Sequence, residues 1–159
     1  MGLNIGVSGG AFNDNGHNVT FQGNTSGSGN LTKTGGTLSL TGSSSMTGTI
    51  NLTEGDLSGT ASSLGNVALS NGTNVTFNQT VDGSYGKLIS GTGSMTKDGA
   101  GNLTINNQQT YSGATNVVAG TLKLQGARPA GTSFFGAQTD VGGGWRTAAQ
   151  TKTYDIDGN

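Results

Sequence analysis

Apolar residues in this sequence occur in short runs in which every second position is apolar. The runs are VTF at 19–21, LSL at 38–40, INL at 50–52, VAL at 67–69, VTF at 75–77, LTI at 103–105 and LKL at 122–124. Glycine, asparagine and serine flank these runs, and period-two alternation between turn residues is typical of half-buried β-strands. No stretch shows the 3.6-residue spacing of an amphipathic helix over several turns. We therefore predict an all-β fold.

The order of these runs repeats along the chain. NVTF at 18–21 returns at 74–77, GNLTKTG at 29–35 returns as GSMTKDG at 93–99, and Gly48, Gly55 and Leu57 correspond to Gly113, Gly120 and Leu122. A strand-and-turn unit of this size cannot bury its apolar face alone, so we expect the units to stack around one continuous core, as in a β-solenoid. The segment between Phe77 and Gly93 is longer than its counterpart, and we interpret the extra residues as a loop insertion.

The composition also fits a disordered chain. Hydrophobic residues are only 30% of the 159 residues, so little apolar burial is available to offset the conformational entropy lost on folding. The alternation favours order, since a disordered chain would scatter its apolar residues. The 31 glycines suit the tight turns of a solenoid. A β-sandwich is the other ordered alternative, but aromatic residues are only 6%, which disfavours a sandwich core. Six or seven coils about 4.8 Å apart would make a rod on the order of 30 Å long.

Charge and cysteine content exclude several classes of function. The net charge of −1 gives no basic surface for nucleic acid. No run of about 20 apolar residues is present, so we expect no membrane-spanning helix. The absence of cysteine excludes disulfides and thiolate metal sites.

The stretch from 90 to 122 carries a specific combination of motifs. It reads SGTGSMTKDGAGNLTI at 90–105, TYSGAT at 110–115 and AGTL at 119–122. This pattern resembles the autotransporter-associated β-strand repeat, also called the passenger-associated transport repeat. Residues 29–57 resemble a degenerate copy, with Met46 where the family prefers tyrosine and one glycine fewer before Leu38.

The resemblance implies a right-handed parallel β-helix in a bacterial protein that is secreted or displayed outside the outer membrane. It implies a stalk or an adhesin-type scaffold, and it brings no catalytic residues and no particular ligand. We therefore expect β-solenoid repeats over residues 1–126, with copies near 18–57 and 74–124, and we expect no enzyme activity and no cofactor.

Residues 127–159 differ in composition from the repeats. They contain the single proline, Pro129, and the aromatic residues Phe134, Phe135, Trp145 and Tyr154. We interpret this segment as a cap over the open end of the solenoid or as the start of a following domain.

The end of the chain offers one candidate metal site. Asp155, Asp157 and Asn159 have the alternate spacing that opens a calcium loop, in which oxygen ligands converge on one ion. The bidentate glutamate of such a loop is missing, and Asp-Gly pairs are also ordinary turn residues.

Other polar residues give competing interpretations. Glu54 and Asp56 are two positions apart, so both could face one side of a strand and supply the carboxylate pair of a polysaccharide-active β-helix. Both also flank Gly55 at a turn. His17 lies in a turn-like segment and has no evident partner. Lys33 and Lys97 occupy the same repeat position, and we interpret them as exposed charges that discourage edge pairing, with contact to acidic glycans as the alternative.

The leading hypothesis is therefore a structural role. The alternatives are a fibre subunit that associates head to tail through the open ends of the solenoid, and a β-helix that binds or acts on a glycan. A host or matrix glycan or protein would be the partner of an adhesin-type scaffold. The pairs Thr32/Thr34 and Thr47/Thr49 do not recur at the coil spacing, which disfavours a flat ice-binding face.

Overall fold

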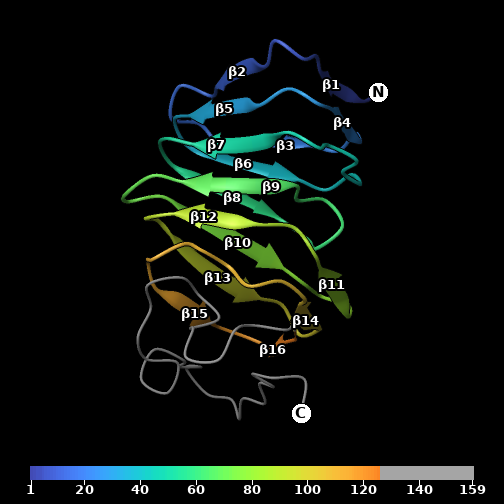
Figure 1. Ribbon diagram of the computed structural model, residues 1–159, viewed down its shortest axis with the longest axis vertical. Helices are drawn as coiled ribbons and strands as arrows, with labels where there is room; N and C mark the ends of the chain where they lie inside the picture. Colours follow the sequence, from blue (N-terminus) through green and yellow to red (C-terminus); the bar gives the residue numbers. More distant parts are fainter. Residues whose placement is uncertain (126–159) are drawn as a thin grey trace.

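The computed structural model describes residues 1–125, and this part of the chain winds into a parallel β-solenoid of about six turns (Figure 1). Its sixteen strands are β1 (Leu3–Ile5), β2 (Gly10–Asn13), β3 (Val19–Phe21), β4 (Thr25–Gly27), β5 (Leu31–Thr34), β6 (Thr37–Leu40), β7 (Thr49–Leu52), β8 (Asp56–Gly59), β9 (Asn66–Leu69), β10 (Asn74–Asn78), β11 (Gly83–Tyr85), β12 (Ile89–Gly91), β13 (Ser94–Asp98), β14 (Asn102–Ile105), β15 (Thr115–Val117) and β16 (Thr121–Leu124). The prediction of an all-β solenoid is confirmed. No helix occurs within residues 1–125, so none there could span a membrane.

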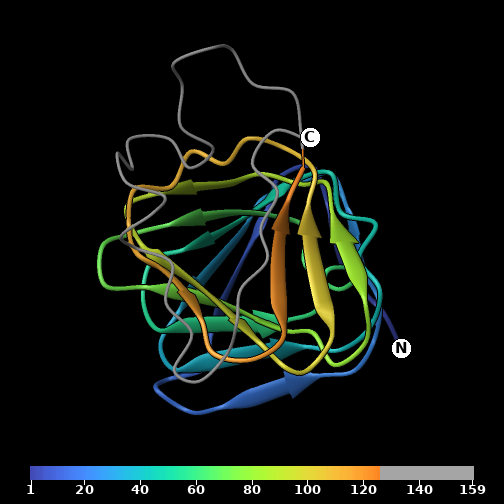
Figure 2. The same ribbon diagram turned by 90° about the horizontal axis from the view of Figure 1, so that it is seen from below.

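Three faces surround the core, as the view along the solenoid shows (Figure 2). Face 1 contains the five strands β2, β5, β7, β9 and β12, and face 2 contains the six strands β3, β6, β8, β10, β13 and β15. Face 3 contains β1 and β4 at the N-terminal end and β11, β14 and β16 at the other end. Between these two groups, Ser44 forms an isolated parallel bridge with Thr25.

The core lies inside the three faces because alternate residues of each strand point inward. On face 2, Leu38, Leu57, Val75 and Met95 stack in register through four successive coils. Each of these side chains is at most 3% exposed. Burying one such side chain contributes about 1.5–3 kcal/mol, so stability accumulates from coil to coil.

The residues between the inward positions form polar ladders outside. On face 2 the strand register joins one residue of each coil, in the order Thr20, Ser39, Ser58, Thr76, Thr96 and Asn116. Thr20, Ser39 and Thr76 are the middle residues of three of the alternating runs. On face 1, Thr32 lies between Ala11 and Asn51 in register, so it is not part of a threonine ladder.

The interpretation of the segment between Phe77 and Gly93 as a loop insertion is wrong. It contains β11 on face 3 and β12 on face 1. Its counterpart between Phe21 and Gly29 contains only β4. Because of the extra strand, each later strand lies one face further around the solenoid than its counterpart. The first copy of the repeat therefore begins on face 1 and the second copy on face 2. The division of the chain near residue 126 stays a prediction.

Glycine is required where the backbones of successive coils meet at the corners. Gly55 has a φ of 71°, and a Cβ there would lie 1.8 Å from the carbonyl oxygen of Gly35 in the coil before it. Gly120 is equivalent in the second copy, with a φ of 69° and a Cβ position 2.4 Å from the carbonyl oxygen of Gly101. A side chain at either corner would push the coils apart.

Candidate functional site

The corner between β5 and β6 encloses a lysine. The side chain of Lys33 is fully buried, and its Nζ lies 2.9 Å from Oδ2 of Asp14 in the preceding coil. Nζ also donates to the carbonyl oxygens of Thr34 at 3.1 Å and Gly36 at 2.7 Å. Oδ1 of Asp14 accepts hydrogen bonds from the backbone amides of Gly16 and Gly36. A single ion pair therefore joins two coils at this corner.

Electrostatics favour the charged form of Asp14. Burial by itself raises the pKa of this carboxyl, but the hydrogen bond from Lys33, the backbone amides of Gly36 and Gly16 and the charge of Lys33 outweigh it. The pKa of Asp14 is therefore held below its ordinary value. An ionised carboxylate compensates the lysine charge, which the interior would otherwise leave unpaired.

The corner between β13 and β14 encloses a second lysine without a carboxylate partner. Nζ of Lys97 donates to the carbonyl oxygens of Asp98 and Gly99, each at 2.7 Å, and of Ala119 at 3.0 Å. Ala119 belongs to the following coil, so this lysine also joins two coils. Desolvation lowers the pKa of Lys97, and the charge of Asp98 acts in the opposite direction. Three carbonyl oxygens here accept from the lysine ammonium group, whereas at the first corner a carboxylate is among its partners.

Gln79 occupies the position of Asp14 at the second corner. Each lies two residues after the phenylalanine that pairs with the lysine of its corner. The side chain of Gln79 is used elsewhere: Oε1 accepts from the amide of Ala61 at 2.9 Å, and Nε2 donates to the carbonyl of Val81 at 2.8 Å. Lys97 consequently reaches forward to the next coil, whereas Lys33 reaches back to the preceding one.

The interpretation of Lys33 and Lys97 as exposed charges is wrong, because both side chains are 0% exposed. The glycine-containing corners turn several carbonyl oxygens toward one point, and an ammonium group satisfies them together. The sequence did contain a signal. Lys33 is in phase with Leu31, and Lys97 is in phase with Met95, so the period-two pattern places both lysines on the inner side.

A second pair of positions differs between the two copies in a matched way. The side chains of Tyr111 and Thr115 are buried, and their hydroxyl oxygens are 2.5 Å apart. The equivalent residues of the first copy are Met46 and Ile50, which are 1% and 0% exposed. A buried tyrosine hydroxyl needs a polar partner. In the second copy this partner is Thr115. In the first copy methionine replaces the tyrosine, and the aliphatic Ile50 replaces the threonine.

These geometric copies coincide with a known sequence family. The family model of the passenger-associated transport repeat matches residues 31–58 and 95–124. The chain carries two passenger-associated transport repeats. No match was found among curated proteins or among solved structures. Each repeat spans two corners in successive coils, and a buried lysine closes the first corner of each.

The acidic candidates flank Gly55 at the corner between β7 and β8, and their side chains are not part of the buried lysine sites. Glu54 and Asp56 are both exposed, and the neighbours of Asp56 in register are Thr37 and Asn74, neither of which is acidic. His17 is exposed and follows a turn, where its amide donates to the carbonyl of Asp14 at 3.0 Å. No group of three potential metal-ligating side chains occurs within residues 1–125.

The predictions for the last part of the chain lie outside the described residues. These are the cap or following domain at 127–159 and the calcium ligands Asp155, Asp157 and Asn159. They stay predictions.

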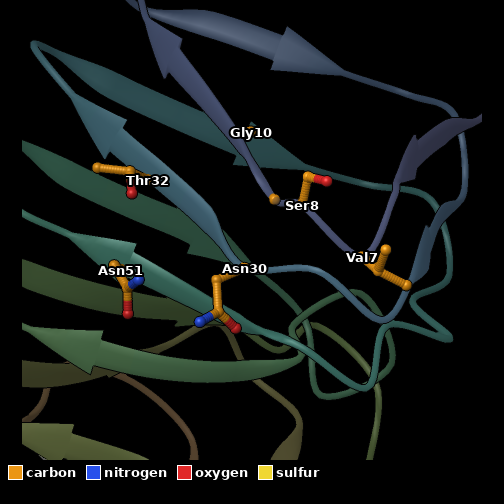
Figure 3. A pocket seen from close by; sticks show the side chains of 7 residues that line it. Val7, Ser8, Gly10, Asn30, Thr32 and Asn51 are labelled. Carbon is orange, nitrogen blue, oxygen red and sulfur yellow. The ribbon is translucent and has the colours of Figure 1, made fainter.

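A polar hollow lies beside the first coils (Figure 3). It has a volume of about 440 Å³ and is lined by Val7, Ser8, Gly9, Gly10, Asn30, Thr32 and Asn51. None of these side chains is charged, so the hollow offers hydrogen bonds but no acid or base for catalysis. Sequence reasoning missed it because its residues come from three coils.

Proposed function

We propose that this chain is a rigid, non-catalytic spacer segment of a secreted or surface-displayed bacterial protein. The observation that carries the proposal is the continuous core of two stacked passenger-associated transport repeats. Such repeats in an uninterrupted solenoid hold the two ends of the segment at a fixed separation, which is what a stalk or an adhesin-type scaffold requires.

The buried corners support rigidity in particular. Each lysine ties two adjacent coils through groups that lie inside the fold, where water competes little. Bending the solenoid at either corner would separate an ammonium group from its buried oxygens, at a cost that an exposed polar contact would not carry.

A distance measurement tests rigidity directly. The chain has no cysteine, so cysteines introduced at the exposed positions Thr20 and Asn116 can be spin-labelled specifically. These positions are five steps apart on face 2, about 24 Å at the spacing of parallel strands. We expect one narrow distribution of distances by pulsed electron paramagnetic resonance. A broad distribution would remove the basis for a spacer.

Export needs a separate test. The chain can be placed between an N-terminal epitope and a bacterial outer-membrane translocation domain, and the epitope then detected on intact cells. We expect surface staining equal to that of a known passenger control. Retention inside the cell, with the same expression level, would count against surface display.

The hollow beside the first coils favours glycan binding as a second candidate function. Thr32 on β5, Asn51 on β7 and Asn30 just before β5 present neutral amide and hydroxyl groups (Figure 3), and such groups suit the hydroxyls of a neutral polysaccharide. A glycan array probes this proposal, with Asn51→Ala as the variant and Asn116→Ala, far from the hollow, as the control. Binding that Asn51→Ala does not weaken, or no binding at all, would exclude the site.

A further inference from the structure

Two turns on one corner of the solenoid contain the same dipeptide, asparagine followed by glycine. Asn15 and Gly16 lie between β2 and β3, and Asn71 and Gly72 lie between β9 and β10. In both turns the chain passes from face 1 to face 2, so the two dipeptides share one corner in different coils. The chemistry of this dipeptide can therefore be compared at two matched places.

The two turns have the same backbone form. In each, the amide of the last residue donates to the carbonyl of the first, from His17 to Asp14 at 3.0 Å and from Thr73 to Ser70 at 3.2 Å. Both glycines have a positive φ, 84° in the first turn and 80° in the second, and a Cβ at either would meet no atom within 4 Å. Both asparagines are exposed. Water and hydroxide can therefore reach both dipeptides.

The turns differ in what holds the amide of the glycine. The amide of Gly16 donates to Oδ1 of the buried Asp14 at 3.2 Å, and the amide of Asn15 donates to Oδ1 of Asn13 at 2.7 Å. Within residues 1–125, the amide of Gly72 has no hydrogen-bond acceptor. The same nitrogen atom is thus held beside an ionised carboxylate in one turn and is free to move in the other.

We propose that Asn71 is a site of spontaneous deamidation in the folded protein, and that the hydrogen bonds of the first turn protect Asn15. After it loses its proton to hydroxide, the nitrogen of Gly72 attacks Cγ of Asn71. The side-chain nitrogen takes up a proton from water and leaves as ammonia, which closes a succinimide ring. Water then opens the ring to aspartate or isoaspartate, so one neutral amide becomes one carboxylate.

The first turn opposes the same reaction in two ways. Gly16 must give up its hydrogen bond to the carboxylate of Asp14 before its nitrogen can turn toward the side chain of Asn15, and hydrogen bonds to charged groups are the stronger ones. The negative charge of that carboxylate also disfavours removal of the proton from the Gly16 amide. The turn at Asn71 presents neither obstacle.

The fold tolerates the product at position 71. Because β9 pairs with β7 and β10 pairs with β8, the turn that contains Asn71 stacks on the turn that contains Glu54. Glu54 is exposed, and repulsion between two exposed carboxylates is weak and is screened by salt. The modified chain therefore stays folded and gains one negative charge on this corner.

Peptide mass spectrometry tests the proposal. The folded chain is incubated at mildly alkaline pH and digested with pepsin at acidic pH, and the conversion of each Asn-Gly dipeptide is followed with time. We expect Asn71 to convert about tenfold or more faster than Asn15. The matched reference is the same chain in concentrated urea, where both turns are lost and the two rates should converge.

A variant assigns the new charge to one residue. Anion-exchange chromatography of the incubated chain should show a growing acidic species, and Asn71→Gln should remove most of it, because glutamine closes the corresponding larger ring far more slowly. An unreacted Asn71, or equal rates at Asn71 and Asn15 in the folded chain, would overturn the proposal. A rate difference that persists in urea would overturn its structural basis. None of these results bears on the spin-label distances, so the spacer proposal is tested independently.

Discussion

The two repeats each bury a lysine ammonium group at the same corner, but they stabilise it with different partners. In the first, the ammonium group of Lys33 is compensated by the carboxylate of Asp14. In the second, the ammonium group of Lys97 is surrounded by three carbonyl oxygens and has no carboxylate contact within 4 Å among the described residues. Both repeats therefore place a cation at this corner, and the partners of that cation differ. The difference also predicts that the two corners respond unequally to substitution.

The largest effect is expected from Lys33→Met. Methionine keeps much of the volume but leaves the Asp14 carboxylate buried without its counter-charge, and an uncompensated buried charge is strongly destabilising. Lys97→Met removes hydrogen bonds to neutral carbonyls and should cost about 2 kcal/mol. Chemical denaturation should therefore show a larger fall in the free energy of unfolding for Lys33→Met than for Lys97→Met.

A double variant sharpens this comparison. Asn at position 14 keeps an oxygen acceptor for the amides of Gly16 and Gly36 but carries no charge. Lys33→Met/Asp14→Asn should therefore recover part of the stability lost in Lys33→Met. If the double variant is less stable than the single one, the carboxylate charge is not the reason for the difference between the corners.

The tyrosine position gives the next largest effect. Met46→Tyr places a hydroxyl in the first repeat beside Ile50, which cannot bond to it, and we expect a loss of about 1–3 kcal/mol. Adding Ile50→Thr recreates the pair found at Tyr111 and Thr115 and should restore part of this loss. A double-mutant cycle measures the coupling between the two positions. A coupling energy of zero would show that the matched difference between the repeats has no energetic basis.

Acid should act on the first corner through Asp14. Since the folded-state pKa of Asp14 lies below its ordinary value of 3.8, its contribution is present above that value and is lost as the pH falls through the lower folded pKa. In this window the unfolded chain binds more protons, so stability falls as the pH falls. Thermal unfolding of the unmodified chain should show this dependence, and Asp14→Asn should reduce it. Equal slopes for the two proteins would assign the acid sensitivity to other carboxyl groups.

The sequence predicted the strands and their stacking, because both depend on local alternation and on the repeat. It did not predict the burial of Lys33 and Lys97, although their phase with Leu31 and Met95 indicated it, because the oxygens that receive them come from corners and from neighbouring coils. It also did not predict that the second repeat begins one face later. That shift depends on whether residues 78–92 form strands or a loop, and their alternation is too short to decide.

The smallest effect is expected at the outer position of the corners, where Glu54 in the first repeat corresponds to Ala119 in the second. The carbonyl oxygen of Ala119 receives Lys97, so the backbone of this position contributes to the corner and its side chain does not. Glu54→Ala should therefore change the free energy of unfolding by no more than about 0.5 kcal/mol. The converse variant, Ala119→Glu, should be tolerated similarly. A large loss in Glu54→Ala would show that the exposed carboxylate supports the first corner, and the two corners would then differ in a second way.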